Sequence, residues 1–203
     1  PFVMAKADEP FSRKTEVFDT TIGWRFINSK LSKLYHPYSM GETAENVAEK
    51  WKLSREVQDK FGLASQQKYF AAHKANRFKE ELVSVLVTKG KESFECMQDE
   101  YPRETSLERL TQLKPAFREG GTVTAGNSSG INDGAAAALL VSESYLKTHS
   151  QKPLARVVAM AIAGVDPAYM GVGPVPAVKK ALQRAGLKIS DIGLFELNEA
   201  FAA

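Results

Sequence analysis

Two kinds of hydrophobic pattern alternate along this chain. Apolar residues that recur three and four positions apart predict helices, and short β-branched or wholly apolar runs predict strands. The predicted helices cover residues 43–51, 54–76, a segment that begins at Thr105 and a segment that follows Pro176. The predicted strands cover residues 82–88, 122–124, 135–141, 154–164 and 192–197, and the polar residues 89–95 predict a turn with an exposed strand edge. This mixture predicts an α/β fold.

Residues at the predicted helix ends agree with this assignment. Ser54 is placed to cap the second helix, and Thr105 and Glu108 have the spacing of a capping box. Pro174 precedes the last helix and Gly186 follows it, which is the asymmetry expected of helix termini. The sequence therefore indicates where three of the helices begin or end.

The helix predicted over 54–76 is amphipathic. Its apolar residues fall roughly on one stripe, namely Val57, Phe61, Ala64 and Ala72. Its charged residues are predicted to form a solvated face, and they include Arg55, Asp59, Lys60 and Lys68. The stripe is expected to pack on a core.

The stretch 120–143, GGTVTAGNSSGINDGAAAALLVSE, joins a polar loop to an apolar run. Gly, Asn, Ser and Asp dominate residues 126–134, and residues 135–141 are continuously apolar. Such a run fits a strand buried on both faces of a sheet, and a buried helix has the same signature. A flexible polar loop beside a buried strand is where α/β proteins place ligand contacts, with a plain connection as the alternative.

Composition and charge narrow the functional classes. The chain has 203 residues, 43% of them hydrophobic, and a net charge of +3 from 27 basic and 24 acidic residues. These values favour a globular chain of one large or two small domains over a disordered one. The charge excess is small and scattered, which argues against a nucleic-acid partner. No apolar run approaches the ~20 residues that cross a bilayer, so we expect no membrane partner.

Cysteine and histidine positions argue against two kinds of chemistry. Cys96 is the single cysteine, so an internal disulfide is impossible, which fits a reducing, cytoplasmic compartment. It lies between Glu95 and Asp99, and nearby carboxylates disfavour a thiolate, so we do not expect Cys96 to be a nucleophile. His36 has no second His or Cys at metal-ligand spacing, and no metal site is expected.

Further motifs carry a resemblance to a known family. They are MGETAENVAEKW at 40–51, SLERLTQLKPAF at 106–117, MGVGPVPAVKKAL at 170–182 and ELNEAFAA at 196–203. With the stretch 122–143 they follow the order of the thiolase family, which the chain resembles along its whole length. DTTIGWRF at 19–26 resembles the bacterial subgroup that includes β-ketoadipyl-CoA thiolases.

The resemblance implies a thiolase-like layered α/β sandwich, ordered αβαβα in the complete protein. It implies a loop domain of mixed helix and strand that binds coenzyme A over 1–131, the last strand region of the N-terminal domain over 132–150, and the start of the C-terminal domain over 151–203. The family's nucleophile motif is expected before Pro1, and its GHP histidine and second cysteine after Ala203. The chain is therefore expected to be an internal fragment.

The activity implied by the resemblance is reversible acyl transfer between a 3-ketoacyl-CoA and coenzyme A. Coenzyme A and acyl-CoA are expected as substrates, with no tightly bound cofactor, and the assembly is expected to be a homodimer or homotetramer. The alternative is a non-catalytic acyl-CoA-binding protein. Acetoacetyl, longer 3-ketoacyl and 3-oxoadipyl chains are all compatible with the sequence.

Six residues match functional positions of the family. Asn198, in the NEAF motif, matches the residue that holds a water for one oxyanion hole, and a helix N-cap is a compatible role. The positions expected to bind coenzyme A or its acyl chain are Met40, Arg103, Phe117, Ser129 and Phe201. The structural alternatives are a surface role for Arg103 and ordinary core packing for Met40.

Residues 199–201 are predicted to begin a helix directly after the strand 192–197. Glu199 then has two interpretations. It could act as a general base, or it could be a first-turn acid that complements the helix dipole, which is the interpretation we favour.

Overall fold

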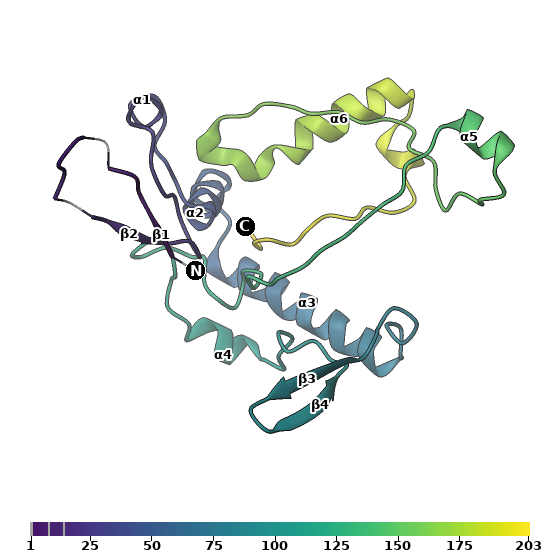
Figure 1. Cartoon of the computed structure of the whole chain (residues 1–203), viewed down its shortest axis with the longest axis horizontal. Helices are drawn as coiled ribbons and strands as arrows, with labels where there is room; N and C mark the ends of the chain where they lie inside the picture. Colours follow the sequence, from purple (N-terminus) through teal and green to yellow (C-terminus); the bar gives the residue numbers. More distant parts are fainter. Residues whose placement is uncertain (1, 8, 14) are drawn as a thin grey trace. The chain divides into compact units, whose positions relative to one another are not determined.

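A computed structural model describes residues 2–7, 9–13 and 15–203 (Figure 1). The chain divides into two compact units, one of residues 1–130 with 199–203 and one of residues 131–198. No helix among the described residues has the length and apolarity needed to span a bilayer.

The first unit begins with a small hairpin and a single helical turn. Strand β1 (Phe2–Met4) pairs antiparallel with β2 (Val17–Asp19), with Phe2 opposite Asp19. Helix α1 (Ser29–Ser32) is capped by the side chain of Asn28, which accepts hydrogen bonds from two backbone N–H groups.

Helix α2 (Met40–Trp51) confirms the first predicted helix and begins three residues earlier than expected. Ser39 forms a capping box: its hydroxyl accepts the N–H of Glu42 at 3.4 Å, and its own N–H donates to Glu42 Oε2 at 2.7 Å. The helix ends at Lys52, which has a left-handed backbone. Its buried face consists of Gly41, Thr43, Ala44, Glu45, Val47 and Ala48.

Helices α3 (Arg55–Lys74) and α4 (Leu107–Thr111) confirm the next two predicted helices. Ser54 caps α3 as expected, since its hydroxyl accepts the N–H of Val57 at 3.3 Å. The cap of α4 is Ser106 and not Thr105, because the hydroxyl of Ser106 accepts the N–H of Arg109. The Thr105–Glu108 capping box was therefore placed one residue too early.

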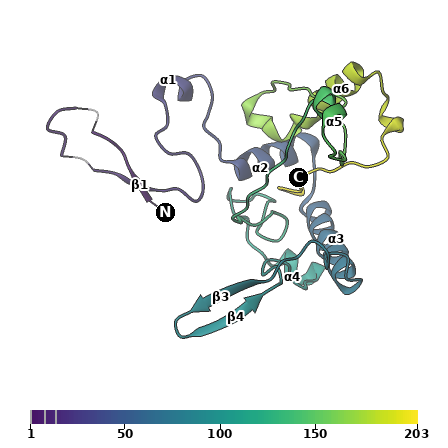
Figure 2. The same ribbon diagram turned by 45° about the vertical axis from the view of Figure 1, so that its right-hand side comes forward.

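A hairpin follows α3 and projects away from it in both views (Figures 1 and 2). Strand β3 (Val85–Lys89) pairs antiparallel with β4 (Glu92–Cys96), with Val85 opposite Cys96. The predicted strand 82–88 is thus present with shifted bounds. The turn with an exposed strand edge predicted over 89–95 is present: Gly90 and Lys91 form the turn, and residues 92–95 belong to the exposed strand β4. One face of an antiparallel hairpin can face water, so its polar side chains are tolerated.

The apolar core of the first unit draws its residues from α2, α4 and the segment 120–128. Its buried apolar residues are Ala44, Val47, Ala48, Leu110 and Val123. The strand predicted over 122–124 is wrong: only Thr124 makes a ladder contact, an isolated bridge to Pro115. These residues form a loop instead, and side chains satisfy their backbone groups.

The second unit contains helices α5 (Glu143–Thr148) and α6 (Pro174–Ala185) and the 3-10 helices η1 (Pro167–Val172) and η2 (Ile189–Asp191). Helix α6 is the fourth predicted helix. It has Pro174 at its first position, and it ends at Gly186, whose φ is +68°. The predicted N-terminal Pro and C-terminal Gly are confirmed.

The strands predicted over 135–141, 154–164 and 192–197 are wrong. The structure assigns none of these residues to a strand (Figure 2). No residue of 131–198 is buried. Leu139 is 85% exposed, Ile162 is 86% exposed and Leu194 is 81% exposed. A strand satisfies its backbone only by pairing with neighbours, and the described part of the chain provides none for these runs.

Candidate functional site

The side chain of Glu45 in α2 binds the backbone of residues 122 and 123, just before the polar loop of residues 126–134. This side chain is buried, with the residue 3% exposed. The carboxylate accepts the N–H of Thr122 at 2.9 Å, the N–H of Val123 at 2.8 Å and the hydroxyl of Thr122 at 3.1 Å. Hydrogen bonds to a charged group are stronger than neutral ones, so this contact fixes the backbone of the loop.

Gly121 makes this close approach possible. A Cβ on Gly121 would overlap Glu45 Oε1 and would lie 2.6 Å from the carboxyl carbon. Only a glycine leaves room for the carboxylate to reach the two N–H groups that follow. In the Gly-Thr-Val sequence at 121–123, the glycine therefore leaves space for the Glu45 carboxylate and the next two residues donate their N–H groups to it.

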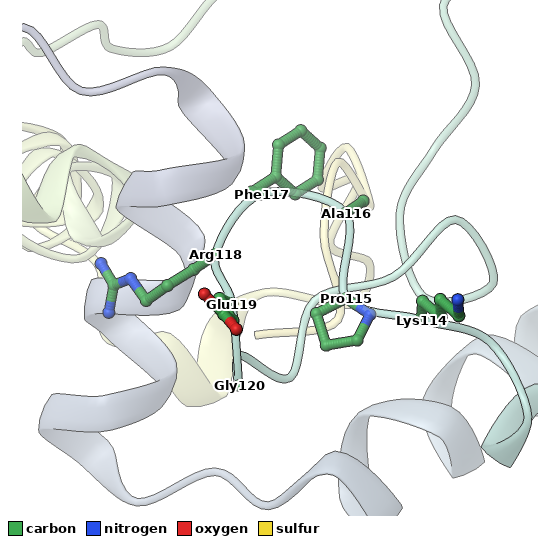
Figure 3. A pocket seen from close by; sticks show the side chains of 7 residues that line it. All are labelled: Lys114, Pro115, Ala116, Phe117, Arg118, Glu119 and Gly120. Carbon is green, nitrogen blue, oxygen red and sulfur yellow. The ribbon is translucent and has the colours of Figure 1, made fainter.

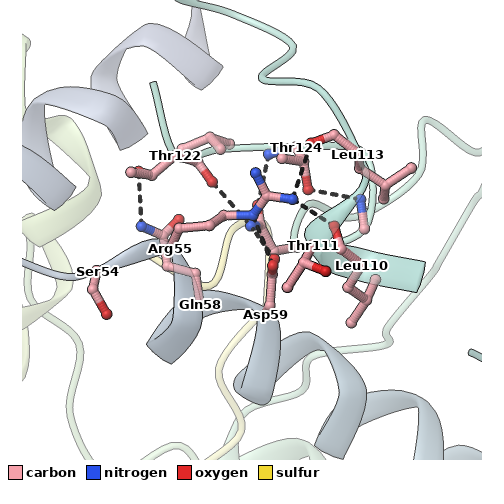
Figure 4. Close-up of polar contacts among 12 residues, drawn as sticks. Ser54, Arg55, Gln58, Asp59, Leu110, Thr111, Leu113, Thr122 and Thr124 are labelled. Atoms are coloured by element: carbon pink, nitrogen blue, oxygen red, sulfur yellow. Dashed lines mark hydrogen bonds and ion pairs between the residues drawn. The ribbon is translucent and has the colours of Figure 1, made fainter. Parts of the chain in front are cut away.

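Asp59 of α3 binds Asn127, at the far end of the segment 122–127 (Figure 4). Asn127 donates from Nδ2 to Asp59 Oδ1 at 2.9 Å and to the Thr122 carbonyl at 3.1 Å, and its Oδ1 accepts the N–H of Thr124 at 2.8 Å. Asp59 is fully buried, and its second oxygen accepts Arg55 Nε at 2.7 Å. The solvated role predicted for Arg55 and Asp59 is wrong.

The same network reaches α4. Arg55 donates from a terminal nitrogen to the carbonyls of Leu110 and Leu113, the latter at 3.0 Å. The Leu110 carbonyl lies in the last turn of α4 and also accepts the N–H of Leu113 at 3.1 Å, and Leu113 itself lies just past the helix. The guanidinium therefore adds a donor at the C-terminal end of α4 (Figure 4). The ion pair of Arg55 and Asp59, which the sequence pattern predicted to be solvated, thus joins α3 to α4 and to Asn127.

Thr122 is shared by both helices. Its hydroxyl accepts Gln58 Nε2 at 2.9 Å and donates to Glu45 at 3.1 Å. Gln58 is fully buried and also donates to the Leu53 carbonyl at 3.1 Å. Its Oε1 is buried without a partner among the described residues.

Ser129 emerges from this anchored segment with its side chain in solvent. Its N–H donates to the Ala200 carbonyl at 2.9 Å, while its hydroxyl makes no hydrogen bond to a described residue. The preceding Ser128 is held on two sides: its hydroxyl donates to the Thr124 carbonyl at 2.7 Å, and its carbonyl accepts the Tyr101 hydroxyl at 2.9 Å. The backbone of Ser129 is fixed, and its hydroxyl is available to a ligand.

Residues 199–203 lie against the loop, although they are distant in sequence. Phe201 forms an isolated bridge with Ser128, and the N–H of Ala202 donates to the Asn127 carbonyl at 2.9 Å. The helix predicted to begin at 199 is wrong. Glu199 instead accepts the Ser65 hydroxyl at 2.6 Å, so its favoured role as a helix-dipole acid is also wrong.

Phe117 connects the remaining predicted residues. Its ring packs edge-to-face on that of Phe201, with centroids 5.9 Å apart and an interplanar angle of 82°. The ring also lies against Gly41, the residue after Met40. Met40 is 57% exposed at the start of α2, so it is not an ordinary core residue.

A pocket of about 380 Å³ lies in the turn around Phe117, lined by residues 114–120 (Figure 3). Arg118 points out of this turn toward α2, where it pairs with Glu49 at 3.2 Å and donates to Asn46. That cation is therefore engaged by α2, whereas Lys114 and Glu119 line the pocket beside Phe117 with exposed side chains.

No described contact links Arg103 or Asn198 to this group. The N–H of Arg103 donates to Gln66 of α3 at 3.0 Å, and its side chain is exposed in the first unit. Asn198 is exposed in the second unit and lies in neither a helix nor a strand. Four predicted residues are thus linked through the first unit. Ser129 lies on the loop, Phe201 bridges to Ser128 and packs on Phe117, and Met40 directly precedes the Gly41 against which the Phe117 ring lies.

The sequence reasoning missed the buried polar residues that support this loop, namely Glu45, Gln58, Asp59 and Asn127. A signal was present for Glu45, because it stands four residues after Gly41 and three before Ala48 on the buried stripe of α2. A charged residue on an otherwise apolar stripe indicates a buried partner. Among the described residues, no group of three His, Cys, Asp or Glu side chains could hold a metal ion.

Comparison with known proteins points to one family. The family model for the thiolase N-terminal domain matches residues 9–144, and that for the thiolase C-terminal domain matches residues 151–203. A beta-ketoadipyl-CoA thiolase of Escherichia coli is 53% identical over 205 residues, covering 100% of this chain and 51% of that protein. An acetyl-CoA acetyltransferase of Rhizobium meliloti (strain 1021) is 53% identical over 178 residues, covering 87% of this chain and 45% of that protein.

Solved structures agree with these relatives. Human mitochondrial 3-ketoacyl-CoA thiolase superposes with a TM-score of 0.81 at 40% identity, covering 100% of this chain and 50% of that one. The acetyl-CoA acetyltransferase of Bacillus anthracis gives 0.79 at 36% identity, covering 98% and 50%. The predicted thiolase-like α/β fold class is confirmed. The chain spans about half the length of the curated relatives it matches.

Proposed function

The chain belongs to the thiolase family, and on that premise we propose that it is part of an acyltransferase that moves an acyl group between a 3-ketoacyl-CoA and coenzyme A. The observation that carries the proposal is Ser129, an exposed hydroxyl on a loop whose backbone is held by buried side chains. A fixed backbone with a free polar side chain is the arrangement expected of a preformed ligand site.

Each residue around the loop has a distinct proposed role. The Ser129 hydroxyl can both donate to and accept from the amides of the pantetheine arm. Phe117 and Phe201 supply apolar walls for that arm, and the soft, flexible side chain of Met40 borders the acyl chain. The exposed guanidinium of Arg103 stacks on adenine or pairs with phosphate at the nucleotide end.

The proposed chemistry is reversible Claisen condensation in the complete protein. A cysteine takes the acyl group as a thioester, and a second cysteine exchanges a proton with the carbon next to a thioester carbonyl. Negative charge then develops on the thioester oxygen, and Asn198 holds a water that donates to it. An amide suits this task because it donates and accepts without carrying a charge.

The proposal extends to the organisation of the complete protein. Residues 1–131 form the domain that binds coenzyme A, residues 132–150 belong to the last strand region of the N-terminal domain, and residues 151–203 start the C-terminal domain. Coenzyme A acts as a substrate with no tightly bound cofactor, and the assembly is a homodimer or homotetramer. The names of the relatives, beta-ketoadipyl-CoA thiolase and acetyl-CoA acetyltransferase, support acyl-CoA substrates.

The test is an assay of the full-length protein that contains this chain. We expect thiolysis of 3-oxoadipyl-CoA or acetoacetyl-CoA that depends on added coenzyme A, and calorimetric binding of coenzyme A alone. Binding without turnover would identify the non-catalytic acyl-CoA-binding protein instead. Neither binding nor turnover would overturn the proposed function.

A further inference from the structure

We propose that Glu45 is a positioning residue for coenzyme A binding, which acts by holding the loop that carries Ser129 and the turn that carries Phe117. This inference rests on the proposed function. Glu45 itself faces the interior of the first unit and touches only protein groups, so its effect on a ligand must pass through these two residues.

Burying Glu45 carries an energetic cost that its partners must offset. A buried carboxylate is unfavourable unless it is paired or fully hydrogen-bonded. Among the described residues no cation forms an ion pair with Glu45, and its partners are the N–H groups of Thr122 and Val123 and the Thr122 hydroxyl. An apolar side chain would fill the space but leave both N–H groups without acceptors, so the carboxylate specifically supports this bend.

A short series of hydrogen bonds leads from Glu45 to Ser129. Glu45 fixes Thr122 and Val123, and the next residue, Thr124, accepts the Ser128 hydroxyl at 2.7 Å on its carbonyl. Ser129 follows directly, with its N–H bound to Ala200. A shift of the backbone at 122–124 therefore moves Ser128 and displaces the Ser129 hydroxyl.

A second path leads from Glu45 to Phe117. The carbonyl of Val123 accepts the N–H of Ala116 at 2.9 Å, and Ala116 directly precedes Phe117. The Phe117 ring lies on Gly41, one helical turn before Glu45 on the same face of α2. One face of α2 thus contacts both the segment that leads to Ser129, the proposed polar contact, and the ring of Phe117, the proposed apolar wall.

The experiment uses the full-length protein with the substitutions Glu45→Gln and Glu45→Ala. The amide of Gln keeps one acceptor oxygen for the loop, whereas Ala keeps none. Gly121→Ala tests the same contact from the loop, because its new methyl group displaces the carboxylate. Val47→Ala is the control: it removes buried apolar volume from the same helix and no hydrogen bond.

Wild-type binding of coenzyme A is measured first, because its absence would overturn the proposed function and this inference with it. With binding present, we expect Glu45→Ala to raise Kd and KM for coenzyme A about tenfold and Glu45→Gln about threefold, each with kcat within about twofold. Gly121→Ala should follow Glu45→Ala. Val47→Ala should lower Tm and leave Kd unchanged.

A double variant separates positioning from general destabilisation. If Glu45 acts through Ser129, adding Ser129→Ala to Glu45→Ala should raise Kd by less than Ser129→Ala does in the wild type. Fully additive effects on Kd, an unchanged Kd in Glu45→Ala, or an equal rise of Kd in Val47→Ala would each overturn the positioning role while leaving the proposed function intact. If the Glu45 variants do not fold, the Kd of Gly121→Ala for coenzyme A, alone and combined with Ser129→Ala, gives the same test.

Discussion

The segments 122–124 and 135–141 have similar strand-type patterns but belong to different units and have different environments. In the first unit, Val123 and Thr124 are fully buried. In the second, Leu139 and Leu140 are 85% and 74% exposed. The patterns alone do not distinguish them. Buried acceptors and donors, supplied by Glu45 and Asn127, serve the backbone of the first segment, and no described side chain serves the second.

The comparison shows which structures a local sequence can complete alone. A helix satisfies its backbone within itself, so α6 forms in the second unit although none of its residues is buried. Its side chains even serve the neighbouring run, since Lys180 and Arg184 donate to the carbonyls of Ile162 and Met160. An extended run depends on groups from elsewhere, and the first unit supplies them as side chains.

The largest expected effect concerns the chain as a whole. The proposed chemistry uses two reactive cysteines, and the 203 residues contain only Cys96, whose thiol lies 3.8 Å from the Gln98 carbonyl. We expect the 203-residue chain by itself to give no thiolysis of acetoacetyl-CoA. Turnover at a rate comparable with that of the full-length protein, abolished by Cys96→Ala, would contradict this.

The next effect tests the difference in burial between the units. Leu110 is 4% exposed, so Leu110→Ala should cost about 2–5 kcal/mol of unfolding free energy in the 203-residue chain. Leu139→Ala, the matched change in the second unit, should cost less than about 0.5 kcal/mol. Urea unfolding of both variants measures this, and equal losses would show that the second unit buries Leu139 in solution.

Asn198 tests whether the exposed unit contributes to catalysis in the full-length protein. Losing one oxyanion donor costs about 100- to 1000-fold in kcat, and we expect Asn198→Ala to lie near 100-fold because a water can persist on other groups. Asn198→Asp should be at least as damaging, since it places a charge near an anionic transition state. The affinity for coenzyme A should change little in the Ala variant; near-normal kcat in both would rule out this role.

Ser129 provides the corresponding test in the first unit. Ser129→Ala removes one hydrogen bond of about 1 kcal/mol, so KM for coenzyme A should rise about fivefold with kcat nearly unchanged. Ser128→Ala is a neighbouring comparison, because its hydroxyl bonds within the loop. A large fall in kcat for Ser129→Ala at unchanged KM would place Ser129 in the chemical step.

The smallest effect concerns the helix that carries Glu45. The N–H of Ser39, donated to Glu42, lowers the pKa of that carboxyl below its ordinary value of 4.5. Because the pKa is lower in the folded state, the ionised Glu42 stabilises the folded chain at a pH above the ordinary value of 4.5. This contribution is lost as the pH falls through the lowered folded-state pKa. Glu42→Gln should therefore reduce Tm slightly at pH 7, and the difference should vanish in the acid range. A difference independent of pH would exclude this charge effect.

Several features could be predicted from residues close together in the sequence. The helices α2, α3 and α6 have the expected periodicity, and Ser54 and Gly186 stand at their ends as local hydrogen bonding requires. The motifs also indicated the family and the residues of the candidate site. Of these, Ser129, Phe201 and Phe117 are linked by contacts in the first unit, and Met40 precedes the Gly41 on which the Phe117 ring lies.

Tertiary structure decided what depends on distant partners. The sequence pattern predicted Asp59 to be solvated, whereas in the fold it accepts a hydrogen bond from Asn127, 68 positions away. Glu199 was predicted to lie at a helix terminus, whereas it accepts a hydrogen bond from Ser65. The runs 135–141 and 154–164 have the composition of buried strands but no partners in the described chain, so they remain unpaired. The physical reason is that helical hydrogen bonds close within four residues, whereas strands and buried charges need groups that only the fold brings near.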